Sequence, residues 1–307
     1  MKIFYSIDDI QIDQPTVLTV GSFDGVHLGH QQIIKQLNSL SKDSHSLEVL
    51  VTFHPHPKEV LVPRANHRIE LLTPLEEKLK LLEKLGLSVI VVLPFTREFA
   101  KTGYREFVID ILLKKLKMKK IVIGHDHTFG RNREGHAEQL KELGKSAHFS
   151  VKVIQPFFLD DEIVSSSRIR QLLKTGEVET ANKLLARKYS LLGRVEKGDN
   201  RGTALGFPTA NIRPIDANKL IPKNGVYAVD IDLSGQQFSG MMNIGHRPTF
   251  NFDPLTLEVH IFKFSSLIYG ERVEVQFKKF IREEIKFNNQ DELKAQLEKD
   301  KKLCLKL

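Results

Sequence analysis

Ten residues near the amino terminus combine residue types that suit the binding of a phosphate group. The segment reads GSFDGVHLGH and runs from Gly21 to His30. Its glycines let the backbone approach a ligand, and the free N–H groups at the start of a helix favour an anion there. His27 and His30 can donate hydrogen bonds to phosphate oxygens that gain charge in a transition state. Two histidines at this spacing can also simply cap a helix, but the nearby glycines and aspartate favour the phosphate site.

The runs on either side of this segment predict where it lies in the fold. An apolar run at 16–20 precedes it and a helix-like run at 30–41 follows it. A turn between a strand and a helix is where open α/β sheets bind ligands. Strands and helices then alternate at crossover lengths, which predicts a parallel, doubly wound sheet with helices on both faces. The expected strands are 47–53, 88–93, 121–123 and 150–155, and the expected helices are 74–85 and 104–118. Thr73 is expected to be the N-cap of the helix at 74–85, with Glu76 completing a capping box.

Two polar loops follow predicted strands and would share the sheet edge with the first segment. His54 comes directly after the strand at 47–53. The loop 124–135, GHDHTFGRNREG, offers Asp126 as an acceptor for a substrate ring or ribityl chain, and Arg131 or Arg133 as a phosphate clamp. A polar surface loop explains this second stretch equally well.

A third motif, VSSSRIRQLL, would open a helix at 165–167 with hydroxyl and N–H groups available to an anion. Arg168 and Arg170 add positive charge to this start. Serine runs cap helices in many proteins, so the motif is a weak signal when it stands alone.

The sequence gives little support for a metal site or a disulfide bond. A metal site is conceivable from His54, His56, His125 and His127, but no acidic or cysteine ligand set accompanies them at a recognisable spacing. Cys304 is the only cysteine, so an intrachain disulfide and a multi-cysteine metal site are both excluded. A single cysteine agrees with a reducing compartment.

Length and charge limit the class of protein. A chain of 307 residues suggests two domains. The net charge of +8 and pI near 9.3 could signal nucleic acid or small polyanionic ligands, and nucleotides account for them adequately. No apolar run reaches the length that a bilayer needs and no signal peptide is visible, so a cytoplasmic protein without membrane or nucleic-acid partners is expected. Much of the basic excess falls at the end of a predicted helix, where it suits the helix dipole: Lys114, Lys115, Lys117, Lys119 and Lys120.

The pattern changes near residues 182–190, where the alternation of helix and strand ends. Runs at 226–233 and 237–243 flank Ser234 and Gly235, which is a hairpin signal. Runs at 257–264 and 272–280 alternate apolar with polar residues, as half-buried strands do. Several antiparallel strands of this length predict a small closed barrel, followed by an amphipathic helix at 290–301.

This second half carries its own candidate chemistry. The stretch GDNRGTALGFPTAN, 198–211, is rich enough in glycine to wrap phosphates, with Gly198, Gly202 and Gly206, although it is not a Walker A pattern. Thr209 and Asn211 offer oxygen ligands that suit Mg²⁺. Glu258, in TLEVHIF, stands among apolar neighbours where a carboxylate can serve as a general base. An exposed strand carboxylate is the plain alternative.

The ordered set of motifs resembles one enzyme family. GSFDGVHLGH is similar to the T/HxGH signature of nucleotidyltransferases, which by itself does not choose the acceptor. Together with TFHPHP, the glycine-rich loop at 124–135 and SSSRIR, it resembles the prokaryotic bifunctional riboflavin kinase/FMN adenylyltransferases, also called FAD synthetases. PTAN, NIGHRPTF and LEVHIF resemble their riboflavin kinase module. His127 replaces the usual phenylalanine, which leaves the flavin packing open, and Ser167 replaces the usual threonine, which keeps a hydroxyl.

The resemblance implies a role for each matching residue. It implies a Rossmann-like nucleotidyltransferase domain at 1–184 and a β-barrel riboflavin kinase domain at 185–307. The catalytic residues would be Glu258, His27 and His30. The adenylyltransferase would bind ATP through Gly21, Ser22, Phe23, Asp24, His27, His30, Ser166, Ser167 and Arg168, and flavin through His54, Asp126 and Arg131. The kinase would bind ATP through Gly198, Gly202, Gly206, Thr209 and Asn211, the last two also holding Mg²⁺.

The expected function is therefore two reactions on one chain: phosphorylation of riboflavin by ATP to FMN, and adenylylation of FMN by ATP to FAD with release of pyrophosphate. The expected partners are these small molecules, with the protein a monomer or weak oligomer. The alternatives are a chain in which one module has decayed, an RNA-binding protein with a synthetase-like fold, and a cytidylyltransferase that uses CTP. Both motif sets are intact and no tRNA-binding appendage is visible, which favours the bifunctional enzyme.

Overall fold

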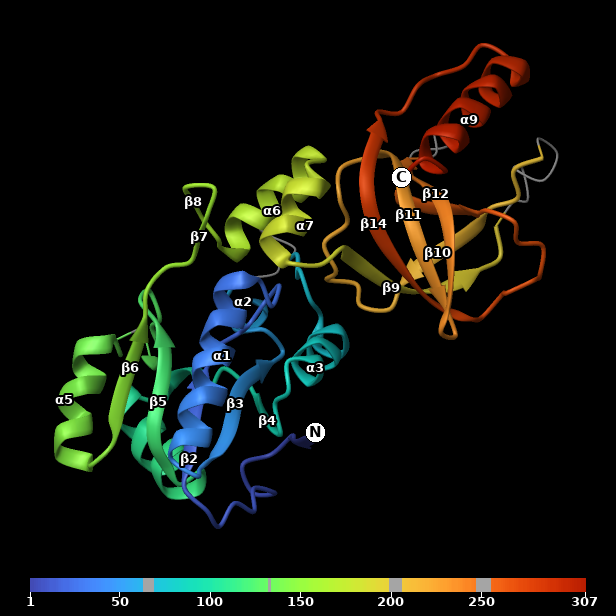
Figure 1. The fold of residues 1–307 in the computed structure, drawn as a ribbon. Coiled ribbons are helices and arrows are strands. Elements are labelled where there is room, and N and C mark those ends of the chain that lie inside the picture. The colour runs from blue at the N-terminus through green and yellow to red at the C-terminus, as the bar shows by residue number, and fades with distance from the viewer. Residues whose placement is uncertain (63–68, 132–133, 199–205, 247–254) are drawn as a thin grey trace. The chain divides into compact units, whose positions relative to one another are not determined.

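The computed structural model describes residues 1–62, 69–131, 134–198, 206–246 and 255–307. By their contacts these residues form two compact units, Met1–Ser165 and Ser166–Leu307 (Figure 1). Within the described ranges, no helix combines the length and the apolar character needed to cross a bilayer.

The described strands of the first unit form a six-stranded parallel sheet with the order β1-β4-β3-β2-β5-β6. The strand β2 is buried along its whole length, as expected for the centre of a sheet that is covered on both faces. The strands are β1 Lys2–Phe4, β2 Thr16–Val20, β3 Leu47–His54, β4 Val89–Pro94, β5 Met118–Gly124 and β6 Ser150–Ile154.

Helices cover both faces of this sheet, so the predicted doubly wound α/β fold is confirmed. One hydrophobic cluster joins the sheet to α1 (Leu28–Asp43) and α3 (Leu75–Lys84). A second cluster on the other face contains residues of the π-helix η2 (Phe107–Lys115) and of α5 (Ala137–Ala147). The shorter elements are α2 Pro57–Leu61, η1 Phe99–Lys101, α4 Tyr104–Glu106 and the hairpin β7 Phe158–Leu159 with β8 Glu162–Ile163.

The strand order places one loop at a special position. From β2 the chain adds β3 and β4 on one side and then crosses to add β5 and β6 on the other. The order therefore reverses between β2 and β5, and in open α/β sheets ligands bind outside the carboxyl ends of the strands at such a reversal. The segment Gly21–His30 follows β2 at this point.

The helix expected at 104–118 is present but ends earlier than predicted. It consists of the short α4 and the π-helical η2, which ends at Lys115. Lys117 adopts a left-handed conformation (φ 54°), and Met118 already pairs with Thr16 in the sheet. Lys119 and Lys120 therefore belong to β5, so the helix dipole accounts for only part of this basic cluster.

The described strands of the second unit close into an antiparallel barrel with the order β10-β13-β12-β11-β14-β9, as predicted. The predicted hairpin is confirmed, with Ser234 and Gly235 both at positive φ in its turn. Its elements are α6 Ser166–Thr175, α7 Val178–Leu185, β9 Tyr189–Glu196, β10 Ala210–Pro214, β11 Gly225–Leu233, β12 Gln236–His246, β13 Leu255–Ile261, β14 Arg272–Arg282 and α9 Gln290–Cys304.

The carboxyl-terminal helix α9 is fixed to the barrel by charge and by packing. Asp300 on α9 is fully buried and accepts hydrogen bonds from both Nε and Nη2 of Arg282 at 2.7–3.1 Å. Cys304 packs in a cluster with Phe207 and Met241, and burial raises the pKa of its thiol to about 11. The helix thus covers part of the outside of the barrel, where the second candidate site lies.

Two candidate active sites

The loop between β2 and α1 has an unusual backbone. Phe23 (φ 49°) and Val26 (φ 42°) are not glycines, yet both adopt left-handed conformations next to Gly25 (φ 94°). Such residues cost free energy and persist only when their surroundings hold them. An added Cβ at Gly25 would also lie 2.9 Å from Leu72, so the loop approaches the segment before α3 closely.

Asp24 supplies the bonds that hold this loop. Its buried carboxylate accepts hydrogen bonds from the backbone N–H groups of Leu72 (3.2 Å) and Thr73 (2.9 Å) and from the Thr73 hydroxyl (3.3 Å). The Thr73 hydroxyl in turn accepts from the N–H of Gly25 at 2.7 Å. The predicted N-cap at Thr73 is wrong: α3 begins at Leu75 without a side-chain cap, because the threonine hydroxyl is committed to the loop.

Lys78 on α3 also supports this loop. Only 4% of this lysine is exposed, and its Nζ donates to the carbonyl of Ser22 (2.7 Å) and to the hydroxyl of Thr52 (3.3 Å). Burial lowers the pKa of Lys78 to about 8, while the nearby carboxylates of Asp24 and Glu59 act in the opposite direction. A buried positive charge therefore lies beneath the residues expected to hold phosphate.

His27 and His30 come together at the start of α1. Their rings stack with centroids 3.7 Å apart and an interplanar angle of 21°, and the ring of Phe23 lies 5.0 Å from that of His30. His27 occupies the N-cap position, but its side chain makes no capping hydrogen bond. His27 therefore does not cap α1 through its side chain, and two histidines at a helix N-terminus could bind an anion.

Ser166, Ser167 and Arg168 begin α6, as predicted, and this helix belongs to the second unit. Arg168 donates to the side chain of Gln171 at 3.4 Å on the same helix. Whether these residues share a site with His27 and His30 stays a prediction.

The residues expected to bind flavin follow β3 and β5. His54 ends β3 and is exposed, and the side chain of Asp126, just after β5, is 82% exposed. Arg131 is exposed and donates its backbone N–H to Thr102. His56 instead caps α2 through its Nδ1 atom and a capping box with Glu59, so its ring has a local structural role. In the described part of the chain, His, Cys, Asp and Glu side chains form no group of three or more that could hold a metal.

A cluster of aromatic rings near the ends of β3 and β4 was not expected from the sequence. Phe53, Phe95, Phe99 and Phe107 contact one another with centroids 5.6–6.5 Å apart. Phe129 extends the cluster, and His127 stacks on it at 5.7 Å and 23°. The signal that could have revealed it is that Phe53 ends one predicted strand and Phe95 follows the end of the next.

The second site is built from one row of residues across the barrel. Asn211 on β10 lies opposite Glu258 on β13, and Glu258 lies opposite Asn243 on β12. The row continues through Val226 on β11 to Arg282 on β14. Directly opposed residues of antiparallel strands project to the same face of the sheet, so a carboxylate stands between two amides. Asn243 was absent from the sequence-based set of site residues, although it begins the NIGHRPTF motif.

A cavity of about 310 Å³ lies over this row. Its polar lining includes Thr209, Asn243 and Glu258, and burial lowers the pKa of a further lining residue, His260. The apolar lining comes from barrel strands, α9 and the residues leading into it: Phe207, Val226, Met241, Met242, Ile285, Phe287, Leu293 and Leu297.

The predicted phosphate loop is described only in part. A side chain at Gly198 would collide with the amide of Asn211, so these two predicted residues are in contact. Gly206 has φ 82°, which a glycine adopts without strain. Gly202 lies outside the described residues.

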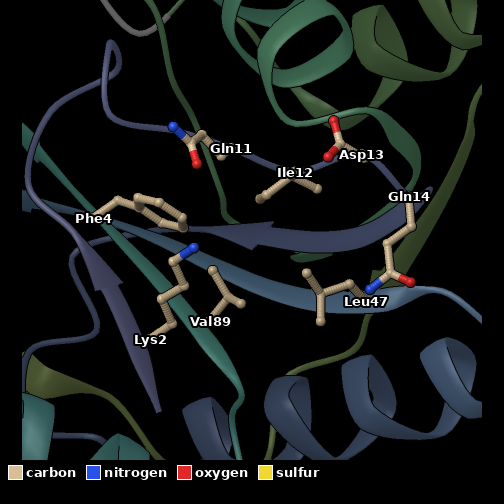
Figure 2. Close-up of a pocket in the computed structure, with 8 residues that line it drawn as sticks. All are labelled: Lys2, Phe4, Gln11, Ile12, Asp13, Gln14, Leu47 and Val89. Atoms are coloured by element: carbon tan, nitrogen blue, oxygen red, sulfur yellow. The ribbon is translucent and has the colours of Figure 1, made fainter.

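A surface hollow of about 440 Å³ lies at the opposite end of the parallel sheet (Figure 2). Lys2, Leu47 and Val89, each at or next to the start of a strand, line it together with residues 11–14 that lead into β2. The sequence-predicted site residues are absent from its lining, which agrees with a site at the carboxyl ends of the strands.

Two protein-family models match separate parts of the chain. A model described as FAD synthetase matches residues 9–168, and a model described as riboflavin kinase matches residues 185–307. The matches define a chain that joins a nucleotidyltransferase domain of the FAD synthetase type to a riboflavin kinase barrel.

Curated relatives carry both domains. A bifunctional riboflavin kinase/FMN adenylyltransferase from Listeria monocytogenes is 40% identical over 98% of this chain and 96% of its own length. Its counterpart from Haemophilus influenzae is 40% identical over 94% of this chain and 92% of its own length. The chain therefore belongs to the bifunctional riboflavin kinase/FMN adenylyltransferase family.

A solved structure from Streptococcus pneumoniae has the same fold over the whole chain. It is 32% identical, has a TM-score of 0.91, and the match covers 100% of this chain and 99% of the other. That protein is named a macrolide-efflux protein. The name does not carry over, because both family models and the curated relatives name flavin enzymes.

The buried charge of Lys78 predicts how stability changes with pH. The folded pKa is depressed to about 8 from the usual 10.5, so between these values the unfolded chain binds a proton that the folded chain has lost. The cost of burying the charge is present below pH 8 and disappears as the pH rises. The free energy of unfolding should therefore rise between pH 8 and 10.5, by up to roughly 3 kcal/mol, relative to Lys78→Met. Urea unfolding of both proteins across this range measures it, and parallel pH profiles would contradict the assignment.

Proposed function

We propose that the two halves of this chain perform consecutive ATP-dependent steps, each with the residues placed above. In the barrel, Glu258 removes the proton of the riboflavin 5′-hydroxyl, and the hydroxyl oxygen attacks the γ-phosphorus of ATP. The bond from that phosphorus to the β-bridging oxygen breaks, and ADP leaves. The product is FMN. The observation that supports this assignment best is the position of Glu258, between Asn211 and Asn243 at the cavity wall.

The mixed lining of this cavity suits riboflavin. Apolar residues such as Met241, Leu293 and Leu297 could contact the planar flavin ring, and Thr209 and Glu258 could contact the hydroxyl that reacts. The fixed position of α9 against Arg282 keeps the apolar wall in place.

The oxygen donors of Thr209 and Asn211 fit Mg²⁺. We propose that the Thr209 hydroxyl and the Asn211 amide oxygen hold the ion, because Mg²⁺ prefers oxygen ligands and shares them with substrate phosphates. Thr209 lines the cavity and Asn211 lies opposite Glu258, so both are close to the proposed base. When bound, the ion would neutralise charge on the transferred phosphate.

In the first unit, an oxygen of the FMN phosphate attacks the α-phosphorus of ATP, and pyrophosphate leaves to give FAD. His27 and His30 donate hydrogen bonds to the phosphate oxygens, assisted by the N-terminus of α1. Ser166, Ser167 and Arg168 hold the leaving pyrophosphate. We place the flavin near His54, Asp126 and Arg131, beside the aromatic cluster that contains Phe129. Positioning and electrostatics carry this step, without a covalent enzyme intermediate.

We also propose a domain boundary, a cellular location and an oligomeric state. We assign residues 1–184 to the adenylyltransferase and 185–307 to the kinase, since the riboflavin kinase model begins at residue 185. By their contacts, α6 and α7 belong to the same compact unit as the barrel, and Asn182 on α7 donates to the carbonyl of Phe277 at 2.9 Å. We propose a cytoplasmic enzyme that acts as a monomer or weak oligomer.

Glu258→Gln tests the kinase assignment. The amide keeps the shape of the carboxylate but cannot accept the hydroxyl proton, so FMN formation from riboflavin should fall by roughly 10²-fold or more. Conversion of FMN to FAD should stay within about twofold of the natural protein, because it uses the other unit. Glu271→Gln, at an exposed position before β14, is the matched control. Equal loss of both reactions in a folded protein would show that the division of labour is wrong.

Replacing both histidines by alanine, His27→Ala with His30→Ala, tests the adenylyltransferase assignment. FAD synthesis should drop by at least roughly 10²-fold, because two donors to the transition-state phosphate are lost, and FMN should accumulate from riboflavin. Chromatography of the flavins over time measures both products. His45→Ala, at an exposed position just after α1, is the control and should behave like the natural protein. Undiminished FAD formation by the double variant would rule out the phosphate role.

A further inference from the structure

The segment 207–209 leads into β10 and must be held by side chains. Pairing of β10 with β13 begins only at Ala210. Pro208 has no N–H group with which to anchor its own backbone. Thr209 ends the segment and lines the cavity together with Glu258. The position of the Thr209 hydroxyl therefore depends on the contacts that fix the two residues before it.

His260 makes the polar contact with this segment. Its Nδ1 atom lies 2.8 Å from the carbonyl oxygen of Pro208. A carbonyl oxygen can only accept, so Nδ1 carries the proton of this hydrogen bond. The imidazole also meets the ring of Phe207 edge-on, with centroids 5.2 Å apart. His260 thus touches both residues that precede Thr209.

The strand geometry joins this contact to the proposed base. His260 and Glu258 are two residues apart on β13, so their side chains project from the same face of the strand. Both line the cavity. The strand β13 therefore carries both the proposed base, Glu258, and the histidine whose hydrogen bond holds the segment with Thr209.

We propose that His260 is a positioning residue of the kinase reaction, whose Nδ1–H group holds the Pro208 carbonyl and so sets the Thr209 hydroxyl against Glu258. The inference rests on the proposed role of Thr209 in holding Mg²⁺. It assigns His260 no contact with substrate. Loss of the bond would free the segment and weaken the binding of Mg²⁺ in the kinase site.

The variants His260→Asn and His260→Gln distinguish the proposed hydrogen-bonding role of His260 from a role in packing alone. The amide nitrogen of asparagine reaches the position of the histidine Nδ1, whereas that of glutamine reaches the position of Nε2. His260→Asn keeps the bond but loses more volume beside Phe207, and His260→Gln keeps more volume but loses the bond. If the hydrogen bond matters, His260→Gln should be the more impaired variant. If only packing matters, His260→Asn should be the more impaired variant.

The experiment measures riboflavin phosphorylation by the full-length variants at several concentrations of MgCl₂. His260→Gln should lower kcat roughly tenfold and raise the Mg²⁺ concentration for half-maximal rate severalfold, as the loss of one buried hydrogen bond implies. His260→Asn should stay within about threefold of the natural protein in both values. FMN adenylylation, measured on the same samples, should be unchanged because it uses the other unit, and the thermal unfolding of each variant reports whether its barrel is folded.

Thr209→Val, measured alongside, separates this inference from the proposed metal site. If Thr209→Val raises the Mg²⁺ requirement but His260→Gln does not, the positioning role is overturned and the metal site stands. If Thr209→Val leaves the Mg²⁺ requirement unchanged, the metal site is wrong and the positioning role falls with it. A His260→Asn variant that is as impaired as His260→Gln, or more so, assigns His260 to packing and also overturns the inference.

Discussion

The carboxylate of Asp24 holds the loop after β2 to the segment before α3, and the proposed phosphate site depends on these hydrogen bonds. A loop that binds phosphate must keep N–H groups and side chains directed outward, which an unsupported chain would not do. Here Phe23 and Val26 adopt left-handed conformations, and each costs of order 1 kcal/mol or more. Asp24, Thr73 and Lys78 offset that cost with buried hydrogen bonds. In the proposed site, these contacts would keep the loop in its binding conformation before a ligand arrives.

In the barrel, the proposed site residues are positioned in a different way. Its proposed reactive residues lie on regular strands, so the pairing of the strands sets Asn211, Glu258 and Asn243 side by side. The segment 207–209, which carries Thr209, lies before the first paired residue of β10. The surrounding wall is completed by α9, which Asp300 fixes to Arg282. In both units, a rigid element positions a backbone segment that regular secondary structure does not fix.

The sequence was enough to predict the architecture, because alternating apolar runs and helical stripes follow from burial. It also indicated that the histidine pair lies at the start of α1. What it missed depends on distant contacts. Thr73 has an N-cap pattern, yet its hydroxyl serves a loop 48 residues earlier in the chain. The strand pairing that sets Asn243 beside Glu258, and the packing that gathers the phenylalanines, arise from register and topology. Sequence spacing does not contain that information.

The most direct test of this account is the ratio of the two activities in Thr73→Val. Valine keeps the shape of threonine, and Thr73 is not among the proposed substrate contacts, so the change removes only the support of the Asp24 loop. We expect kcat for FMN adenylylation to fall roughly tenfold, in line with the loss of buried hydrogen bonds, while riboflavin phosphorylation stays unchanged. An adenylylation rate equal to that of the natural protein would contradict the claim that this bond network prepares the phosphate site.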